Sequence, residues 1–134
     1  MNKVSLIIPC LNEEEGIEKV LIDVGKVNLN NEFILLPLVI DNNSSDNTAD
    51  LARRLGAQVI TENRQGKGYA VKKGFSALPK DANYVVMIDG DSTYQIKEIG
   101  LLLKDLFSGV ADVVVGDRLH GKIEKEHYQE EIFL

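Results

Sequence analysis

Residues 84–91 read YVVMIDGD, an apolar run that leads directly into two acidic residues separated by a glycine. Four other short apolar runs occur along the chain, at residues 4–9 (VSLIIP), 33–40 (FILLPLVI), 57–61 (AQVIT) and 112–116 (DVVVG). Near-continuous hydrophobicity over so few residues is typical of strands that are buried on both faces of a parallel sheet. The five runs therefore predict five strands of one mostly parallel sheet.

Segments with helical spacing separate these runs, at residues 13–26, 46–55, 68–77 and 96–107. Strand and helix alternate four times, which predicts an α/β fold with helices on both faces of the sheet. Pro37 lies inside the second run and lacks the N–H that a central strand needs, so we expect that strand to begin at Leu38. Residues 120–134 are charged and give the fifth strand no following helix, so we expect the fold to be incomplete at its C-terminus.

The composition is that of an ordinary globular protein. The chain has 134 residues, which we expect to form one domain, and a net charge of −6. Nucleic-acid binding needs clustered Lys and Arg, so the acidic balance argues against a nucleic-acid partner. The sequence has no signal-peptide pattern and no apolar stretch of about 18 residues. We therefore expect a cytoplasmic protein without a transmembrane segment.

The few cysteine and histidine side chains are poor candidates for catalysis. Cys10 is the only cysteine, which excludes an internal disulfide. It ends an apolar run with no histidine nearby in sequence, so we interpret it as a small packed side chain rather than a nucleophile. His120 and His127 lie in the charged C-terminal stretch and are interpreted as surface residues.

Polar residues gather directly after each predicted strand. They occupy residues 11–15, 41–48, 63–68, 89–93 and 116–118. In an open parallel sheet, ligands bind beyond the carboxyl ends of the strands. We expect all five loops to open on one edge of the sheet, and four of them carry acidic residues. This coincidence is the main architectural indication of a binding site.

Asp89, Gly90 and Asp91 form the sharpest local signal. Two carboxylates separated by one small residue can point toward the same hard cation, and Mg²⁺ and Mn²⁺ take such oxygens while leaving positions free for a diphosphate. The alternative is an ordinary turn, because Asp and Gly dominate turns. The position directly after an apolar strand, at the predicted site edge, favours a metal site.

Two further loops suggest contacts to a phosphorylated ligand. Asp41 ends the second strand and is predicted to accept a hydrogen bond from a base or ribose, with Ser45 or Asp46 as the N-cap of the next helix. Residues 66–68 (GKG) open the third helix, where backbone N–H groups and Lys67 can hold an anion. The spacing is not that of a Walker motif, and a solvated loop is the alternative.

Five segments, taken in order, resemble family-two glycosyltransferases of the GT-A fold. They are residues 4–21 (VSLIIPCLNEEEGIEKVL), 39–57 (VIDNNSSDNTADLARRLGA), 63–75 (NRQGKGYAVKKGF), 85–99 (VVMIDGDSTYQIKEI) and 112–119 (DVVVGDRL). They look most like the branch that contains dolichyl-phosphate mannosyltransferases and bacterial polyprenyl-phosphate glycosyltransferases. The resemblance extends from Lys3 to about Lys122, and the ordered set is more specific than any single motif.

The resemblance implies a Rossmann-like, nucleotide-sugar-binding fold and transfer of a sugar from a UDP- or GDP-linked donor, mostly with inversion. The expected acceptor is a polyprenyl or dolichyl phosphate. Mg²⁺ or Mn²⁺, held by Asp89 and Asp91, would neutralise charge on the departing diphosphate. Asp91 and Arg118 are the catalytic candidates. The expected nucleotide-sugar contacts are Pro9, Leu11, Glu13, Asp41, Asn43, Lys67, Asp89, Gly90 and Asp91.

Three departures from the family pattern affect these expectations. Leu11 stands where many relatives have an aromatic residue, and Gly90 replaces the commoner Ala, a change that we expect to loosen the loop. Relatives also continue well past this length into an acceptor region, so we expect residues 1–134 to be the N-terminal part of a longer family domain. No catalytic base can be assigned. A lipid acceptor would place the protein peripherally at the cytoplasmic membrane face.

Two other functions stay open. A nucleotide-sugar-binding module would keep the pocket but transfer no sugar, because the acceptor region is absent. A nucleotidyltransferase would share the sheet and the paired aspartates, but its Gly-rich, Arg- and Lys-bearing loop after the first strand is missing. A dinucleotide site lacks its G-x-G-x-x-G anchor. An unpaired strand edge would favour pairing with a second copy, so we also expect self-association into a homo-oligomer.

Overall fold

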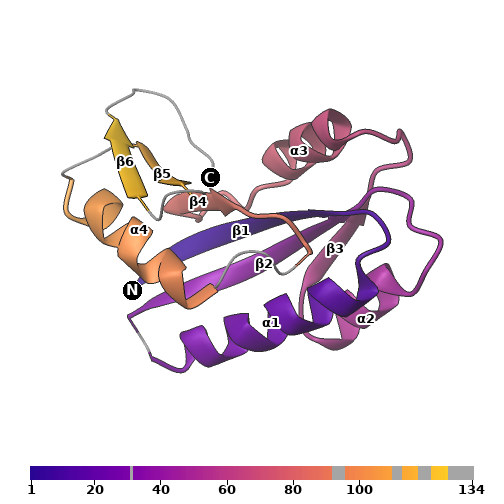
Figure 1. The fold of residues 1–134 in the computed structure, drawn as a ribbon, viewed down its shortest axis with the longest axis horizontal. Coiled ribbons are helices and arrows are strands. Elements are labelled where there is room, and N and C mark those ends of the chain that lie inside the picture. The colour runs from indigo at the N-terminus through magenta and orange to yellow at the C-terminus, as the bar shows by residue number, and fades with distance from the viewer. Residues whose placement is uncertain (31, 92–95, 110–112, 118–121, 127–134) are drawn as a thin grey trace.

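A computed structural model describes residues 1–30, 32–91, 96–109, 113–117 and 122–126 of the chain (Figure 1). Strand and helix alternate through α4, as the apolar runs predict. The elements are β1 Asn2–Cys10, α1 Glu14–Asn28, β2 Phe33–Asp41, α2 Thr48–Arg54, β3 Gln58–Thr61, α3 Lys67–Ser76, β4 Tyr84–Met87, the short 3-10 helix η1 Ile96–Glu98, α4 Ile99–Phe107, β5 Val113–Asp117 and β6 Lys122–Glu126.

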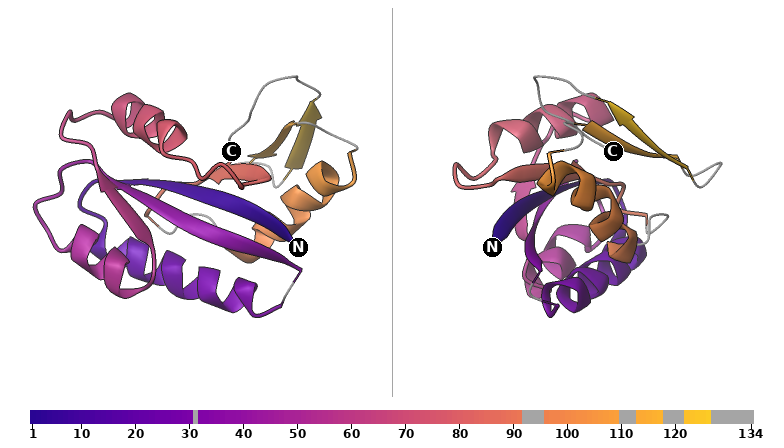
Figure 2. Two further views of the ribbon diagram at one scale, coloured as in Figure 1. Left: turned by 180° about the vertical axis from the view of Figure 1, so that it is seen from behind. Right: turned by 90° about the vertical axis from the view of Figure 1, so that its left-hand side faces the viewer.

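The central sheet has four parallel strands in the order β3-β2-β1-β4. The longest pairing joins β1 to β2, from Asn2 opposite Phe33 to Cys10 opposite Asp41. All four strands run in one direction, so their carboxyl ends share one edge. Helices α1 and α2 cover one face, and α3 covers the other (Figures 1 and 2). The predicted α/β architecture with helices on both faces is confirmed.

The apolar core is divided by the sheet because side chains alternate along each strand. On the face of α1 and α2, Leu6 and Ile8 of β1 pack with residues of those helices and of α4, such as Leu103. On the α3 face, Ile7 packs with Ala70. Each fully buried Leu or Ile contributes about 1.5–3 kcal/mol, so these two layers account for much of the driving force for folding.

Pro37 lies inside β2, so the prediction that this strand begins at Leu38 is wrong. β2 starts at Phe33, and Pro37 is paired with Leu6 of β1. The physical reason is the short length of β3, which pairs only with the residues from Leu38 to Asp41. Before Leu38, β2 is paired on one side only within the described residues, and proline is tolerated on such an edge.

The fifth apolar run does not join the central sheet, so the prediction of a fifth parallel strand with its loop on the common edge is wrong. β5 instead pairs in antiparallel fashion with β6, as a separate two-stranded sheet. This pair lies beside α4 (Figures 1 and 2). Arg118, His120 and His127 lie outside the described residues. Among those that are described, no helix combines the length and apolar character needed to span a bilayer.

Ser5 provides a test of the packing on the α3 face. Its side chain is buried, and its hydroxyl has no hydrogen-bond partner within the described part of the chain. A buried unpaired polar group costs about 1–3 kcal/mol. We expect Ser5→Ala to raise the free energy of unfolding by about 0.5–1 kcal/mol, measured by urea denaturation.

A matched control lies two residues along the same strand. Ile7→Ala removes a fully buried side chain from the same face and should lower the free energy of unfolding by about 2–5 kcal/mol. A loss of stability in Ser5→Ala as well would contradict the absence of a partner for the hydroxyl.

Candidate functional site

A pocket of about 280 Å³ opens at the carboxyl edge of the sheet. Its walls come from the loops after β1, β2 and β4 and from the first two turns of α3. The structure thus brings together seven of the residues that the sequence proposes for the nucleotide sugar. The lining residues are Pro9, Cys10, Leu11, Glu13, Asn42, Lys67, Ala70, Asp89, Gly90 and Asp91.

Two of the proposed site residues, Asp41 and Asn43, do not line this pocket. Asp41, at the end of β2, is buried, and its Oδ1 accepts a hydrogen bond from the Ser44 backbone N–H at 3.3 Å. Asn43 is exposed and has a φ of 65°, a left-handed conformation that Asn tolerates better than most residues. Arg118 lies outside the described residues. Asp41 therefore holds its own loop in shape, beside the pocket.

Asn12 ties the loop after β1 to the loop after β2. Its Oδ1 accepts hydrogen bonds from the Ser45 backbone N–H at 2.8 Å and from the Ser45 hydroxyl at 3.2 Å. Its own backbone N–H donates to Ser44 Oγ at 2.9 Å, and the Glu13 N–H donates to Thr48 Oγ1 at 2.9 Å. These hydrogen bonds thus join the loop after β1 to the loop after β2 at the carboxyl edge of the sheet.

The start of α2 is close to the predicted one. The helix begins at Thr48 with Asn47 in the N-cap position, and the side chain of Asn47 makes no capping bond. One residue earlier, Asp46 Oδ1 accepts the Thr48 N–H at 2.9 Å and is also hydrogen-bonded to the Thr48 hydroxyl. Burial acts to raise the pKa of Asp46, but these hydrogen bonds outweigh it and the pKa is lowered.

Asn42 holds the loop that precedes α3. Its side chain is buried, and its Nδ2 donates to the backbone oxygens of Glu62 at 2.9 Å and Arg64 at 2.8 Å. Its Oδ1 accepts the Gly66 N–H at 2.9 Å. Gly66 has a φ of 141°, which a side chain would rarely allow. These contacts fix the backbone directly before Lys67.

The loop after β4 approaches β1 and α1 very closely, and two glycines make this possible. A Cβ on Gly16 would lie 2.3 Å from the Gly90 backbone oxygen. A Cβ on Gly90 would lie 2.5 Å from Cys10 Sγ. Gly90 therefore has a packing role in addition to the expected loosening of the loop, because Cys10 fills the space that an alanine methyl group would need.

Cys10 itself is a packed side chain, as its sequence context predicts. It is buried, and its Sγ lies 3.5 Å from the Ile8 backbone oxygen. Burial raises the pKa of the Cys10 thiol, and the nearby carboxylates of Glu13 and Asp41 raise it further. The thiol therefore stays protonated at neutral pH, which makes it a poor nucleophile.

Several acidic side chains gather around Glu13 on one side of the pocket. Burial raises the pKa of Glu13, and repulsion from Asp91, Asp46 and Asp89 adds to the shift. Lys67 offsets part of this charge, because its Nζ lies 2.6 Å from Asp89 Oδ1. Carboxylates that repel one another in this way form a favourable environment for a cation.

The arrangement fits a metal ion that is shared with a ligand. Within the described part of the chain, no group of three or more His, Cys, Asp or Glu side chains is assembled to hold a metal. Asp89 and Asp91 would supply two carboxylates. Mg²⁺ is commonly bound through one or two carboxylates together with substrate phosphates, so two are enough where a diphosphate completes the shell.

Cys10, Asn42 and Ala70 line the pocket without a predicted role there. An asparagine in a polar loop has the same sequence signature whether its amide contacts a ligand or the backbone. The fit of Cys10 against Gly90 is visible only once β1 and the loop after β4 are adjacent in space.

Comparison with known proteins agrees with this geometry. The family model described as "Glycosyl transferase family 2" matches residues 5–133. The chain belongs to this family. Membership of glycosyl transferase family 2 explains why the parallel sheet and the ordered loop motifs occur together in this chain.

Two named relatives from this family each match most of this chain, but the two proteins differ in length. Protein RfbJ of Shigella flexneri is 39% identical over 115 residues, which are 86% of this chain and 84% of RfbJ. The dolichyl-phosphate hexose transferase of Haloferax volcanii is 34% identical over 115 residues, 86% of this chain and 47% of that protein. The chain thus spans about half the length of the second relative.

A solved structure shares the fold. Glucosyl-3-phosphoglycerate synthase from Mycobacterium tuberculosis, in complex with Mn²⁺, UDP and glucosyl-3-phosphoglycerate, has a TM-score of 0.65 and 28% sequence identity. The match covers 78% of this chain and 39% of the synthase. Together with the four-stranded parallel sheet, it confirms the predicted GT-A architecture.

The contact between Gly90 and Cys10 can be tested by a double-mutant cycle. We expect Gly90→Ala to lower the free energy of unfolding by about 1–3 kcal/mol, because the added methyl group overlaps Cys10 Sγ. Cys10→Ala in the same chain should restore most of that loss. Gly68→Ala is the control, since a Cβ there meets nothing within 4 Å. Strictly additive effects of the two changes, measured by urea denaturation, would contradict the contact.

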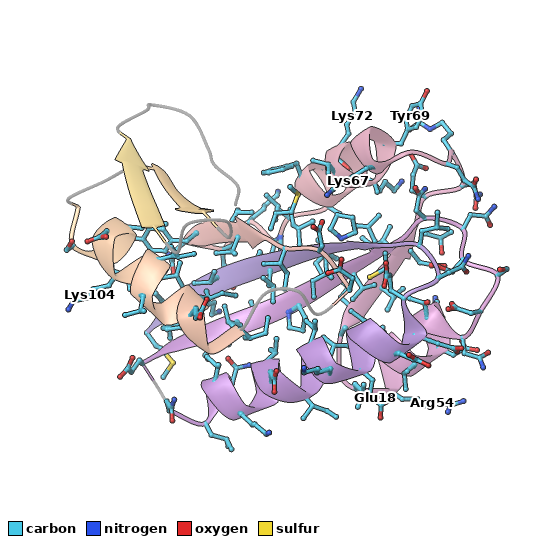
Figure 3. The ribbon with its side chains drawn as sticks, in the orientation of Figure 1. Glu18, Arg54, Lys67, Tyr69, Lys72 and Lys104 are labelled. Carbon is cyan, nitrogen blue, oxygen red and sulfur yellow. The ribbon has the colours of Figure 1, made fainter. Side chains whose placement is uncertain are left out.

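The raised pKa of Glu13 predicts a pH-dependent stability. Above the ordinary value of 4.5 and up to the raised value, the folded state binds more protons than the unfolded state, so stability falls as pH rises through that window. We expect Glu13→Gln to raise the melting temperature at pH 8 and to have little effect at pH 4. Glu18→Gln, on the exposed surface of the same helix (Figure 3), is the control. An effect of Glu13→Gln that does not change with pH would contradict the proposed repulsion.

Proposed function

We propose that this chain binds a nucleoside diphosphate sugar together with a divalent cation and that the sugar is transferred to an acceptor. The observation that carries the proposal is the composition of the pocket. It combines a lysine at the N-terminus of α3 with the paired carboxylates Asp89 and Asp91 after β4. A diphosphate bridged by a metal ion needs both features, a cationic contact and acidic ligands for the ion.

The proposed cofactor is Mg²⁺ or Mn²⁺, held by Asp89 and Asp91. Burial raises the pKa of Glu13, and the neighbouring carboxylates of Asp91, Asp46 and Asp89 raise it further; these carboxylates support a cation at this place. The related synthase was solved with both Mn²⁺ and UDP, which also supports a metal–nucleotide pair. The ion would neutralise charge on the departing diphosphate. Asp91 and Arg118 stay the catalytic candidates.

For the donor, we propose a UDP- or GDP-linked sugar. Pro9 and Leu11 line the pocket beside the metal-binding loop and would lie along the nucleotide. Asp41 and Asn43 lie in the adjoining loop after β2, where Asp41 could accept a hydrogen bond from the base or ribose if it releases Ser44. Glu13, at the start of α1, and Gly90 complete the proposed contacts.

For the acceptor, we propose a polyprenyl or dolichyl phosphate at the cytoplasmic membrane face. Support comes from the relative named as a dolichyl-phosphate hexose transferase. The oxygen of a phosphate acceptor is already anionic at neutral pH, so the reaction would need little assistance from a base. Self-association of the chain stays a prediction.

Calorimetry tests the binding half of this proposal. UDP and GDP, each titrated with Mn²⁺ present, should show binding of one nucleotide that becomes much weaker in EDTA. Asp91→Asn and Asp89→Asn should weaken the Mn²⁺-dependent binding by roughly tenfold or more, because the charge of the ligand set controls the affinity for the metal. Asp50→Asn, the same change at an exposed position on α2, is the matched control. No heat with either nucleotide would sink the proposal.

Transfer is tested separately. The protein is incubated with UDP- and GDP-linked sugars, Mn²⁺ and a polyprenyl phosphate, and the lipid fraction is analysed for sugar. Transfer that depends on Asp91 is the expected result. Metal-dependent nucleotide binding without any transfer would support the alternative of a binding module.

A further inference from the structure

The ion pair between Lys67 and Asp89 has a consequence for metal binding. Lys67 lies in the first turn of α3, and its Nζ is 2.6 Å from Oδ1 of Asp89, directly after β4. Asp89 is one of the two carboxylates proposed for the metal ion. The ammonium group thus lies at the same carboxylate that a divalent cation would use.

The backbone that carries Lys67 is held, while its side chain can move. Asn42 binds the preceding loop at three points, including the Gly66 N–H. The Lys67 side chain is 63% exposed and that of Asp89 is 34% exposed. An ion pair this exposed adds little to stability, so it can exchange partners at low cost. Lysine suits an exchange because its ammonium is a compact charge on a flexible chain.

We propose that Lys67 and the divalent cation compete for Asp89, and that a nucleoside diphosphate relieves the competition by taking the ammonium group. The inference rests on the proposed function. Two cations cannot share one carboxylate oxygen without strong repulsion. With the diphosphate bound, Lys67 pairs with phosphate oxygens and leaves Asp89 to the metal. Each ligand then favours binding of the other, as thermodynamic linkage requires.

A lysine that only anchors phosphate would behave differently. Its removal would weaken nucleotide binding and leave binding of the metal alone unchanged, apart from a general change in charge. Competition instead predicts effects of opposite sign on the two ligands. A second lysine on the same helix measures the general charge effect. Lys72 is exposed, makes no ion pair within the described residues and points away from the sheet (Figure 3).

The experiment measures binding of Mn²⁺ alone to the wild-type protein, Lys67→Met and Lys72→Met by the loss of the free Mn²⁺ signal in electron paramagnetic resonance. We expect Lys67→Met to bind Mn²⁺ about two- to fivefold more tightly than wild type, which is the range expected for the loss of a partly exposed competing pair. Lys72→Met should change the affinity by less than about twofold. Equal effects of the two variants would overturn the competition.

A second measurement uses UDP and GDP in EDTA, followed by calorimetry at high protein concentration. Here Lys67→Met should weaken binding of the nucleotide that wild type prefers, while Lys72→Met should not. Nucleotide binding that is unaffected by Lys67→Met would overturn the exchange. Failure of the proposed function looks different, because wild type would then bind neither nucleotide even with Mn²⁺ present.

Discussion

Parallel pairing of β1 with strands on both of its sides is the constraint on which the site depends. β1 is paired along its whole length with β2 and over Val4–Ile7 with β4, so the polar segments after these strands emerge at the same edge. Segments that are 80 residues apart in sequence, those of Cys10 and Gly90, are thereby placed in contact. A sheet with another strand order would contain the same motifs without assembling them.

The side-chain amides of two asparagines connect the loops that strand pairing brings to this edge. Asn12 joins the loop after β1 to the loop after β2, and Asn42 joins the loop after β2 to the loop before α3. An amide carries a donor and an acceptor, so one side chain can bridge backbone groups of both kinds. The loops are therefore connected in series around the pocket. Asn12 and Asn42 thus help to decide whether the charged residues of the pocket are correctly placed.

Much of the fold could be predicted from the sequence, and the failures have clear causes. Short apolar runs and helical spacing identified the elements up to α4, and the rule that ligands bind beyond strand ends identified the polar loops. The run in β5 looks like a parallel strand because an apolar pattern shows burial but not the identity of the partner. Its partner β6 reads KIEKE, which has too little apolar character to indicate a strand. Pro37 was misjudged because the short length of β3 leaves β2 partly at an edge.

The site was predictable only at the level of charges and motifs. Glu13, Lys67, Asp89 and Asp91 stand out because they are charged residues in the loops beyond the strand ends, where ligands bind to a parallel sheet. Contacts between side chains are a different matter. The packing role of Gly90 depends on Cys10, and no pattern within either segment reveals that they meet.

The two faces of the sheet are unequally filled, and this bears on the motions of the protein. Among the described residues, Ala70 of α3 packs with only three buried strand residues, Ile7, Leu38 and Ile40, whereas the opposite face holds a much larger cluster. Local opening has the lowest free energy where the fewest apolar contacts are broken. Backbone amides of α3 should therefore exchange with deuterium before those of α1. The hydrogen bonds of Asn42 to the loop before α3 thus have a second use, because they hold the helix that has the smaller apolar support.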